Sequence, residues 1–156
     1  MKHMLIAAAL TGGLLLGGWV VHAESNRVTF PDLDKQVHYT TVKRGNVTEH
    51  ISTTREAIDA MQNGRPIPDG THFVLADYRD GTIHRYFVME KGKDFGADFD
   101  ERTRTDDWRF QWFWPDQRIN LKETTTRCMA CHRAQRNQGY LFTGGRILDF
   151  HGTPVE

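Results

Sequence analysis

The two cysteines of this chain lie in the stretch RCMACH, residues 127–132, with two residues between them and a histidine directly after the second. Any covalent link made through cysteine must use Cys128 and Cys131, because the 156 residues include no other cysteine. Residues 124–136 have a helical pattern that closes near a glycine, so we expect both thiols on or beside one helix. We therefore expect the functional site of the fold at this segment.

Three kinds of site use such a pair. A redox disulfide usually begins a helix after a strand in an α/β frame, which this sequence does not show. A structural zinc ion needs four ligands, and this motif offers at most three, with the adjacent Cys131 and His132 poorly placed for one ion. Two thiols on one helical turn can instead add to the two vinyl groups of one porphyrin, while the histidine reaches the iron. We predict one covalently attached haem c, with Cys128 and Cys131 as thioether anchors and His132 as the proximal iron ligand.

The N-terminus has the pattern of a secretory signal. A short basic start, MKHM, precedes the apolar run LIAAALTGGLLLGGWVV, and VHA then places Val21 and Ala23 at the two positions that a signal peptidase reads. An uncleaved membrane anchor is the alternative. We expect a signal peptide at residues 1–23, a haem-binding domain at residues 24–156, a periplasmic location and no membrane span after cleavage.

The charge balance limits the partners. Lys and Arg number 20 and so do Asp and Glu, which gives no bulk charge to attract nucleic acid. Nucleic acid is therefore not an expected partner, and the length suits one domain with a core.

The clearest local signal is a β-hairpin around RDGT, because Asp80-Gly81 favours a two-residue turn. Continuous pairing from this turn sets Leu75 opposite Tyr86 and puts Phe73 on the same face. We also expect a strand ending at Val42, a helix at 52–64 capped by Thr53 and Glu56, a polar loop at 91–107 and a strand at 108–114.

The sixth coordination position of the iron determines function. A Met or His there makes a sealed electron carrier, an apolar wall admits neutral diatomic molecules, and a base with polar groups allows catalysis. No spacing singles out a sixth ligand among the candidates, which are Met61, Met89, His38, His50, His72, His84 and His151.

Four segments in this order resemble the cytochrome P-460 family, which includes the cytochrome c′-beta proteins. They are FPDLDKQVHYTTV, IPDGTHFV, YFVMEKGKDF and CMACHRAQRNQGYLFT, and the likeness runs from about Phe30 to Thr143. The resemblance implies an α+β fold, mainly an antiparallel β-sheet with a few helices, one haem per chain and commonly a homodimer.

The family also has two functional branches. In the P-460 branch a lysine is cross-linked to the porphyrin and the protein oxidises hydroxylamine; in the c′-beta branch the distal side is apolar and five-coordinate iron binds nitric oxide. In this sequence the resemblance puts Leu75 at the position of that lysine, and leucine cannot form the bond. A distal acid of the hydroxylamine-oxidising branch corresponds to Glu90, or the position of that acid is taken by Phe87.

We therefore expect a gas-binding mono-haem cytochrome, with Leu75, Phe73 and Tyr86 on the distal wall and no catalytic residue assigned. Its partners would be a small diatomic or nitrogen-compound ligand and a redox protein. A hydroxylamine-oxidising enzyme and a six-coordinate electron carrier are the alternatives.

Overall fold

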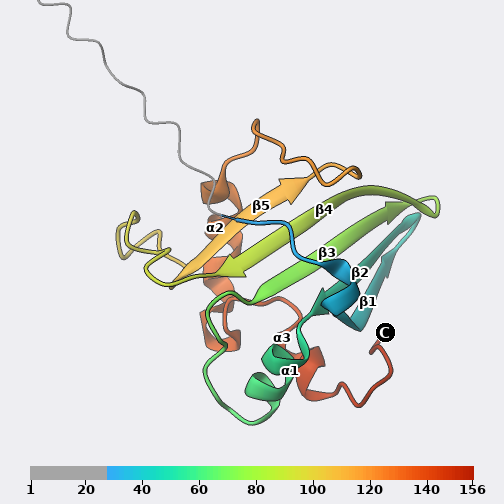
Figure 1. Ribbon diagram of the computed structural model, residues 1–156, viewed down its shortest axis with the longest axis horizontal. Helices are drawn as coiled ribbons and strands as arrows, with labels where there is room; N and C mark the ends of the chain where they lie inside the picture. Colours follow the sequence, from blue (N-terminus) through green and yellow to red (C-terminus); the bar gives the residue numbers. More distant parts are fainter. Residues whose placement is uncertain (1–27) are drawn as a thin grey trace, which may run out of the picture.

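The fold is seen in a computed structural model that describes residues 28–156; the predicted signal peptide lies outside the described residues. Its centre is one antiparallel sheet in which the strands are adjacent in chain order (Figure 1). The strands are β1 (Val37–Arg44), β2 (Val47–Thr53), β3 (His72–Arg79), β4 (Thr82–Lys91) and β5 (Trp108–Phe113). The helices are α1 (Arg55–Gln62), α2 (Thr125–His132) and α3 (Gly144–Leu148), with 3₁₀ turns η1 (Leu33–Lys35) and η2 (Arg133–Gln138). The expected α+β architecture is confirmed.

Tight turns set the order of the strands. In the β3–β4 hairpin Asp80 and Gly81 have φ angles of 49° and 76°, the left-handed pair that suits the twist of two adjacent strands. The β1–β2 hairpin uses Gly45-Asn46, with Gly45 at φ 59°. Strand β2 had no counterpart among the predicted elements.

A β-bulge corrects the predicted pairing of the hairpin. Asp77 pairs with Arg85, but the next residue of β3 pairs with Ile83, so one residue of β4 is left over. Leu75 therefore lies opposite Phe87, not Tyr86, and the expectation that Tyr86 shares the face of Leu75 is wrong. A shift of one residue moves every later side chain of β4 to the other face.

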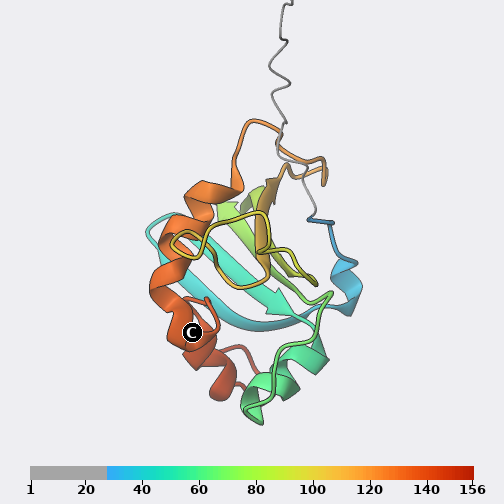
Figure 2. The same ribbon diagram turned by 90° about the vertical axis from the view of Figure 1, so that its left-hand side faces the viewer.

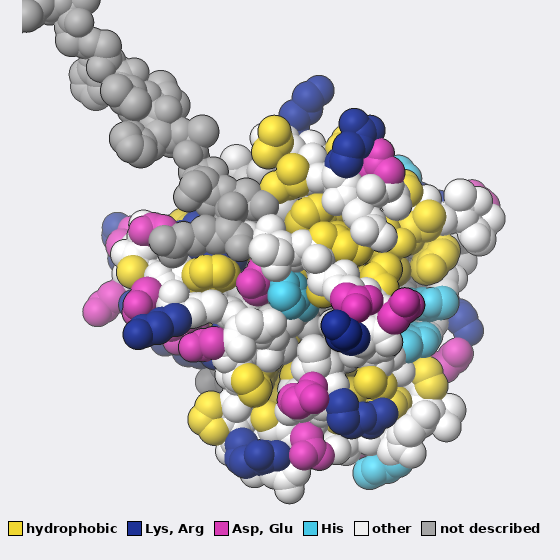
Figure 3. All heavy atoms as spheres, viewed as in Figure 1, with side chains coloured by type: hydrophobic (Ala, Val, Ile, Leu, Met, Phe, Trp, Pro, Cys, Tyr) yellow, Lys and Arg dark blue, Asp and Glu magenta, His cyan; other side chains and the backbone are white. Residues whose placement is uncertain are grey.

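Other segments of the chain cover both sides of the sheet. Figure 2 shows α2 and the C-terminal segment on one side and the first described residues on the other. On this second side, which Figure 3 shows, Phe30 meets Tyr86 and Phe113 edge to face, each with ring centroids 5.2 Å apart.

The helices α1 and α3 pack together below the sheet (Figure 1). Helix α1 begins after Thr54, whose hydroxyl accepts a hydrogen bond from the backbone N–H of Ala57 over 3.2 Å. The predicted cap was Thr53, but Thr53 ends β2 and its hydroxyl donates to the carbonyl oxygen of His72 over 2.7 Å. A hydrogen bond links the two helices: the side-chain amide of Gln62 in α1 donates to the carbonyl oxygen of Ile147 in α3 over 2.9 Å.

The chain end is part of the fold. Thr41 donates its backbone N–H to the carbonyl of Val155 over 3.0 Å, and the N–H of Val155 donates to the carbonyl of Tyr39 over 2.9 Å. Within residues 28–156, no helix has the length and hydropathy needed to cross a bilayer.

Candidate functional site

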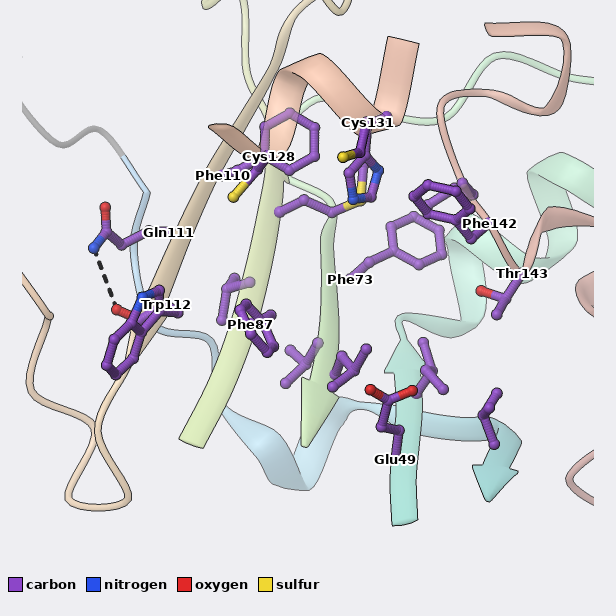
Figure 4. Close-up of a pocket in the computed structure, with 18 of the residues that line it drawn as sticks. Glu49, Phe73, Phe87, Phe110, Gln111, Trp112, Cys128, Cys131, Phe142 and Thr143 are labelled. Atoms are coloured by element: carbon purple, nitrogen blue, oxygen red, sulfur yellow. Dashed lines mark hydrogen bonds between the residues drawn. The ribbon is translucent and has the colours of Figure 1, made fainter. Parts of the chain in front are cut away.

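A cavity of about 590 Å³ lies between the sheet and the segments that carry α2 and α3. This volume is in the range of sites that enclose a small organic ligand or cofactor. Figure 4 shows the sulfur atoms of Cys128 and Cys131 at one end, with Phe87 and Glu49 across the cavity from them.

The side of the sheet that faces this cavity is arranged in rows, because directly paired residues share a face. The first row is Thr53, Phe73, Met89 and Phe110, and the next is Ile51, Leu75, Phe87 and Trp112. The third row is charged and consists of Glu49, Asp77 and Arg85. The cavity is therefore apolar near the cysteines and charged at the far end of the sheet.

Helix α2 presents both thiols to the cavity. Its first residue, Thr125, is tied to β5 because its hydroxyl accepts the backbone N–H of Phe110 over 3.2 Å. Cys128 is partly buried and Cys131 is exposed, and both line the cavity. Burial, with a smaller contribution from the carboxylate of Glu123, raises the pKa of the Cys128 thiol to about 11.

His132 ends α2 with one ring nitrogen already bonded. Its Nδ1 lies 2.6 Å from the carbonyl oxygen of Tyr140, and because a carbonyl only accepts, Nδ1 carries the proton. The rings of Phe110 and Phe142 flank the imidazole, with centroids 4.6 Å and 4.9 Å away. Burial lowers the pKa of His132 below its ordinary value, against the opposite effect of the Tyr140 carbonyl. The neutral ring therefore keeps an unprotonated Nε2.

These features fit a haem bound through the CxxCH turn. Two thiols one turn apart face an apolar space, and the adjacent imidazole has a lone pair on Nε2 with Nδ1–H held by a main-chain carbonyl. A hydrogen bond of this kind orients metal-ligating histidines and fixes their tautomer. Cys128 and Cys131 would hold the porphyrin and His132 would ligate the iron.

Of the hairpin residues predicted to line the site, Phe73 and Leu75 do so. Tyr86 does not, because the bulge turns it to the other face of the sheet, where it contacts Phe30. Phe87 takes its place in the cavity wall.

Of the seven candidates for the sixth iron ligand, only Met89 lines the cavity. His38 and His50 stack on each other, with centroids 4.6 Å apart, and His50 also meets the ring of Tyr78. His72 bonds to the carboxylate of Glu90 over 3.2 Å.

Glu90 does not line the cavity either. It accepts the backbone N–H of Thr29 over 2.7 Å, in the N-terminal segment that covers the other side of the sheet. Phe87, the second option for the position of a distal acid, lies in the cavity wall. Lys91 bonds to Asp106 over 2.8 Å, and no lysine is among the described residues that line the cavity.

Sequence reasoning missed several lining residues. Phe142 lies in the motif CMACHRAQRNQGYLFT but was not predicted to line the site. Ile51 and Glu49 were missed because strand β2 was not predicted. The four β-branched residues of VTEHIST, which follows a Gly-Asn pair, were a usable signal for that strand. Arg146 had no local signal, because only the return of the chain to β1 brings it to the cavity.

Comparison with known proteins agrees with this geometry. A search of curated proteins found no match to the chain. Residues 32–143, more than two thirds of the 156, match the family described as Cytochrome P460. This range holds the whole sheet, both cysteines and His132. The chain therefore belongs to the Cytochrome P460 family of haem proteins.

Proposed function

We propose that this protein is an exported mono-haem c-type cytochrome of the c′-beta kind, which binds nitric oxide or a similar small neutral ligand at five-coordinate iron. The observation that carries the proposal is the row Ile51, Leu75 and Phe87, which gives the cavity an apolar wall on three adjacent strands.

The chemistry of the pocket supports a neutral ligand. His132 would ligate the iron of a bound haem, and the iron would supply a centre that can bind a small ligand. Side chains such as Leu75 and Phe87 offer no proton and no hydrogen bond, so they disfavour water and anions but admit diatomic molecules. By the resemblance to the family, Leu75 takes the place of the cross-linking lysine of the hydroxylamine-oxidising branch, and leucine cannot form that link.

The proposal includes covalent attachment and export. Cys128 and Cys131 have the CxxCH spacing of c-type haem attachment and both line the cavity, which supports two thioether bonds to one porphyrin, and this attachment takes place on exported chains. Cleavage after Ala23 predicts a mature chain that begins with Glu24. Mass spectrometry of the protein secreted to the periplasm would test that start.

One observation favours hydroxylamine oxidation as a second candidate. Glu49 places a carboxylate in the cavity lining, where it could accept a proton. Arg44 holds that carboxylate at 2.6 Å, so Glu49 is paired and at the charged end rather than among the apolar rows. Turnover of hydroxylamine that is lost in Glu49→Gln would favour this second function over gas binding.

The optical spectrum of the purified holoprotein separates the candidates. The proposal predicts a high-spin ferrous spectrum that shifts on addition of carbon monoxide or nitric oxide, without the red-shifted P-460 band. A low-spin ferrous spectrum that carbon monoxide leaves unchanged would contradict it. Leu75→Lys should still attach haem, because the side chain lines the wall and does not anchor the cofactor.

A further inference from the structure

Four arginines among the described residues line the cavity, and they differ in whether a carboxylate of the protein neutralises their charge. Arg44 lies 2.6 Å from the carboxylate of Glu49, and Arg127 lies 3.4 Å from that of Glu123. Arg85 lies 3.0 Å from the carboxylate of Asp77, which is itself buried. Each of these three guanidinium groups therefore has a carboxylate partner within the protein.

Arg146 differs from them. Its Nη1 donates to the hydroxyl of Thr40 over 2.9 Å and to the carbonyl oxygen of Thr41 over 3.1 Å, with a longer contact of 3.4 Å to the carbonyl of Val155. All three acceptors are neutral. Among residues 28–156 no carboxylate forms an ion pair with Arg146, although its side chain is partly buried and lines the cavity. A partly buried cation without an anion is costly unless a ligand supplies one.

The contacts also fix the direction of the guanidinium. Nη1 is committed to β1 and the chain end, so the remaining donors of the group, on Nε and Nη2, are available on its other edge. Two parallel N–H groups in a plane match the two oxygens of a carboxylate. Thr143, which bonds to the buried Tyr39 hydroxyl over 2.6 Å, also lines the cavity (Figure 4).

We propose that Arg146 binds a propionate carboxylate of the haem. This inference rests on the proposed covalent haem, because a porphyrin bound through its two vinyl groups still carries two propionate side chains. Within residues 28–156, Arg146 is the one lining arginine without a carboxylate partner, and a propionate would supply that counter-ion. A small oxyanion such as nitrite has the same chemistry, and the experiment must separate the two.

The test uses holoprotein carrying Arg146→Gln or Arg146→Lys, with Arg127→Gln as the matched control for loss of one positive charge at the cavity. Haem staining on a denaturing gel first establishes that each variant carries covalent haem, which tests the proposed function separately. Resonance Raman spectra then report the propionate bending band, and a redox titration reports the potential.

We expect Arg146→Gln to shift the propionate band and to lower the reduction potential, because loss of the cation favours the ferric state. The proton affinity of the propionate should rise at least about tenfold, since an opposite charge nearby holds a carboxyl ionised. Arg146→Lys should fall between wild type and Arg146→Gln, and Arg127→Gln should leave the Raman band in place.

Two results would overturn the proposal. One is a propionate band that is identical in wild type, Arg146→Gln and Arg146→Lys. The other is an unchanged band together with a loss of nitrite binding to the ferric protein in Arg146→Gln, which would assign Arg146 to an exogenous anion. If Arg146→Gln yields no folded holoprotein, Arg146→Lys decides, because it keeps the charge but loses the two-pronged contact.

Discussion

The Nδ1 atom of His132 donates a hydrogen bond to the carbonyl oxygen of Tyr140 over 2.6 Å. Tyr140 has a φ of 66° and follows Gly139 at 64°, so two successive left-handed residues turn the chain back toward the end of α2. This local turn aims a main-chain carbonyl at the imidazole. The motif CxxCH and the residues just after it therefore act as one unit: the helix presents the thiols, and the turn fixes the tautomer of the histidine.

The register of β4 predicts different effects for two adjacent aromatic residues. Phe87→Ala should change the rate of carbon monoxide binding to the ferrous protein, because Phe87 lines the cavity. Tyr86→Ala should leave that rate unchanged, because Tyr86 packs against Phe30 on the opposite face. Each substitution should cost about 2–3 kcal/mol of stability at these half-buried positions. Flash photolysis and chemical denaturation measure the two effects, and equal ligand-binding rates in Phe87→Ala and wild type would contradict the assigned register.

The two thiols should differ in reactivity before haem is attached. In apoprotein at pH 8, iodoacetamide should alkylate Cys131 at least about tenfold faster than Cys128, since the reactive species is the thiolate and access limits the reaction. Cys131 is exposed, whereas Cys128 is partly buried with its thiol pKa raised to about 11. Peptide mapping by mass spectrometry gives both rates. The difference should disappear in urea, and equal rates in the folded apoprotein would show that the orientation of α2 is wrong.

Met89 offers a direct test of iron coordination. It is the only one of the seven sequence candidates that lines the cavity, and it lies in the row of Phe73 and Phe110. Met89→Leu, a substitution of similar volume, should cost less than about 1.5 kcal/mol and leave the high-spin spectrum unchanged. Conversion of a low-spin wild-type spectrum to a high-spin one in Met89→Leu would identify an electron carrier sealed by this methionine.

Glu90 should contribute to the acid stability of the fold and not to the haem site. Burial opposes ionisation of this carboxyl, but hydrogen bonds from His72 and Thr29 prevail and hold its pKa below the ordinary 4.5. When the native-state pKa of a carboxyl is lower than its unfolded-state pKa, the ionised group stabilises the fold at pH values above the unfolded-state pKa. This contribution is lost as the pH falls through the native-state pKa. In Glu90→Gln, thermal unfolding should therefore depend less steeply on pH below about pH 4.5.

The haem spectrum of Glu90→Gln at neutral pH provides the control for this prediction. It should match that of the wild type, because Glu90 lies outside the cavity lining. A changed spectrum, or an unchanged acid dependence of the unfolding temperature, would contradict the structural role.

Local signals predicted the parts of the fold that depend on neighbouring residues. Asp80-Gly81 specified its hairpin turn, and the CxxCH spacing specified a helix with both thiols at a site. The bulge after Asp77 could not be read from the sequence, because either register leaves apolar residues on both faces of β4. The assignment of Tyr86 failed for this reason.

Long-range contacts explain what else was missed. Arg146 reaches the cavity because the chain end pairs with β1, and Glu49 enters it through the register of β2 with Asp77. The residues around Glu49 could have indicated the strand β2 but not its register with β3, and nothing near Arg146 in the sequence indicates the pairing of the chain end with β1. The apolar wall was thus predicted in part, through Phe73 and Leu75, while the charged end of the cavity required the structure.

The most direct test of the account is the intact mass of the mature protein, expressed with the machinery for cytochrome c maturation and measured after denaturation. We predict the mass of the chain from Glu24 plus one haem, with the haem retained after extraction in acidic acetone and lost in the Cys128→Ala, Cys131→Ala double variant. A colourless chain with the mass of the polypeptide alone would contradict it.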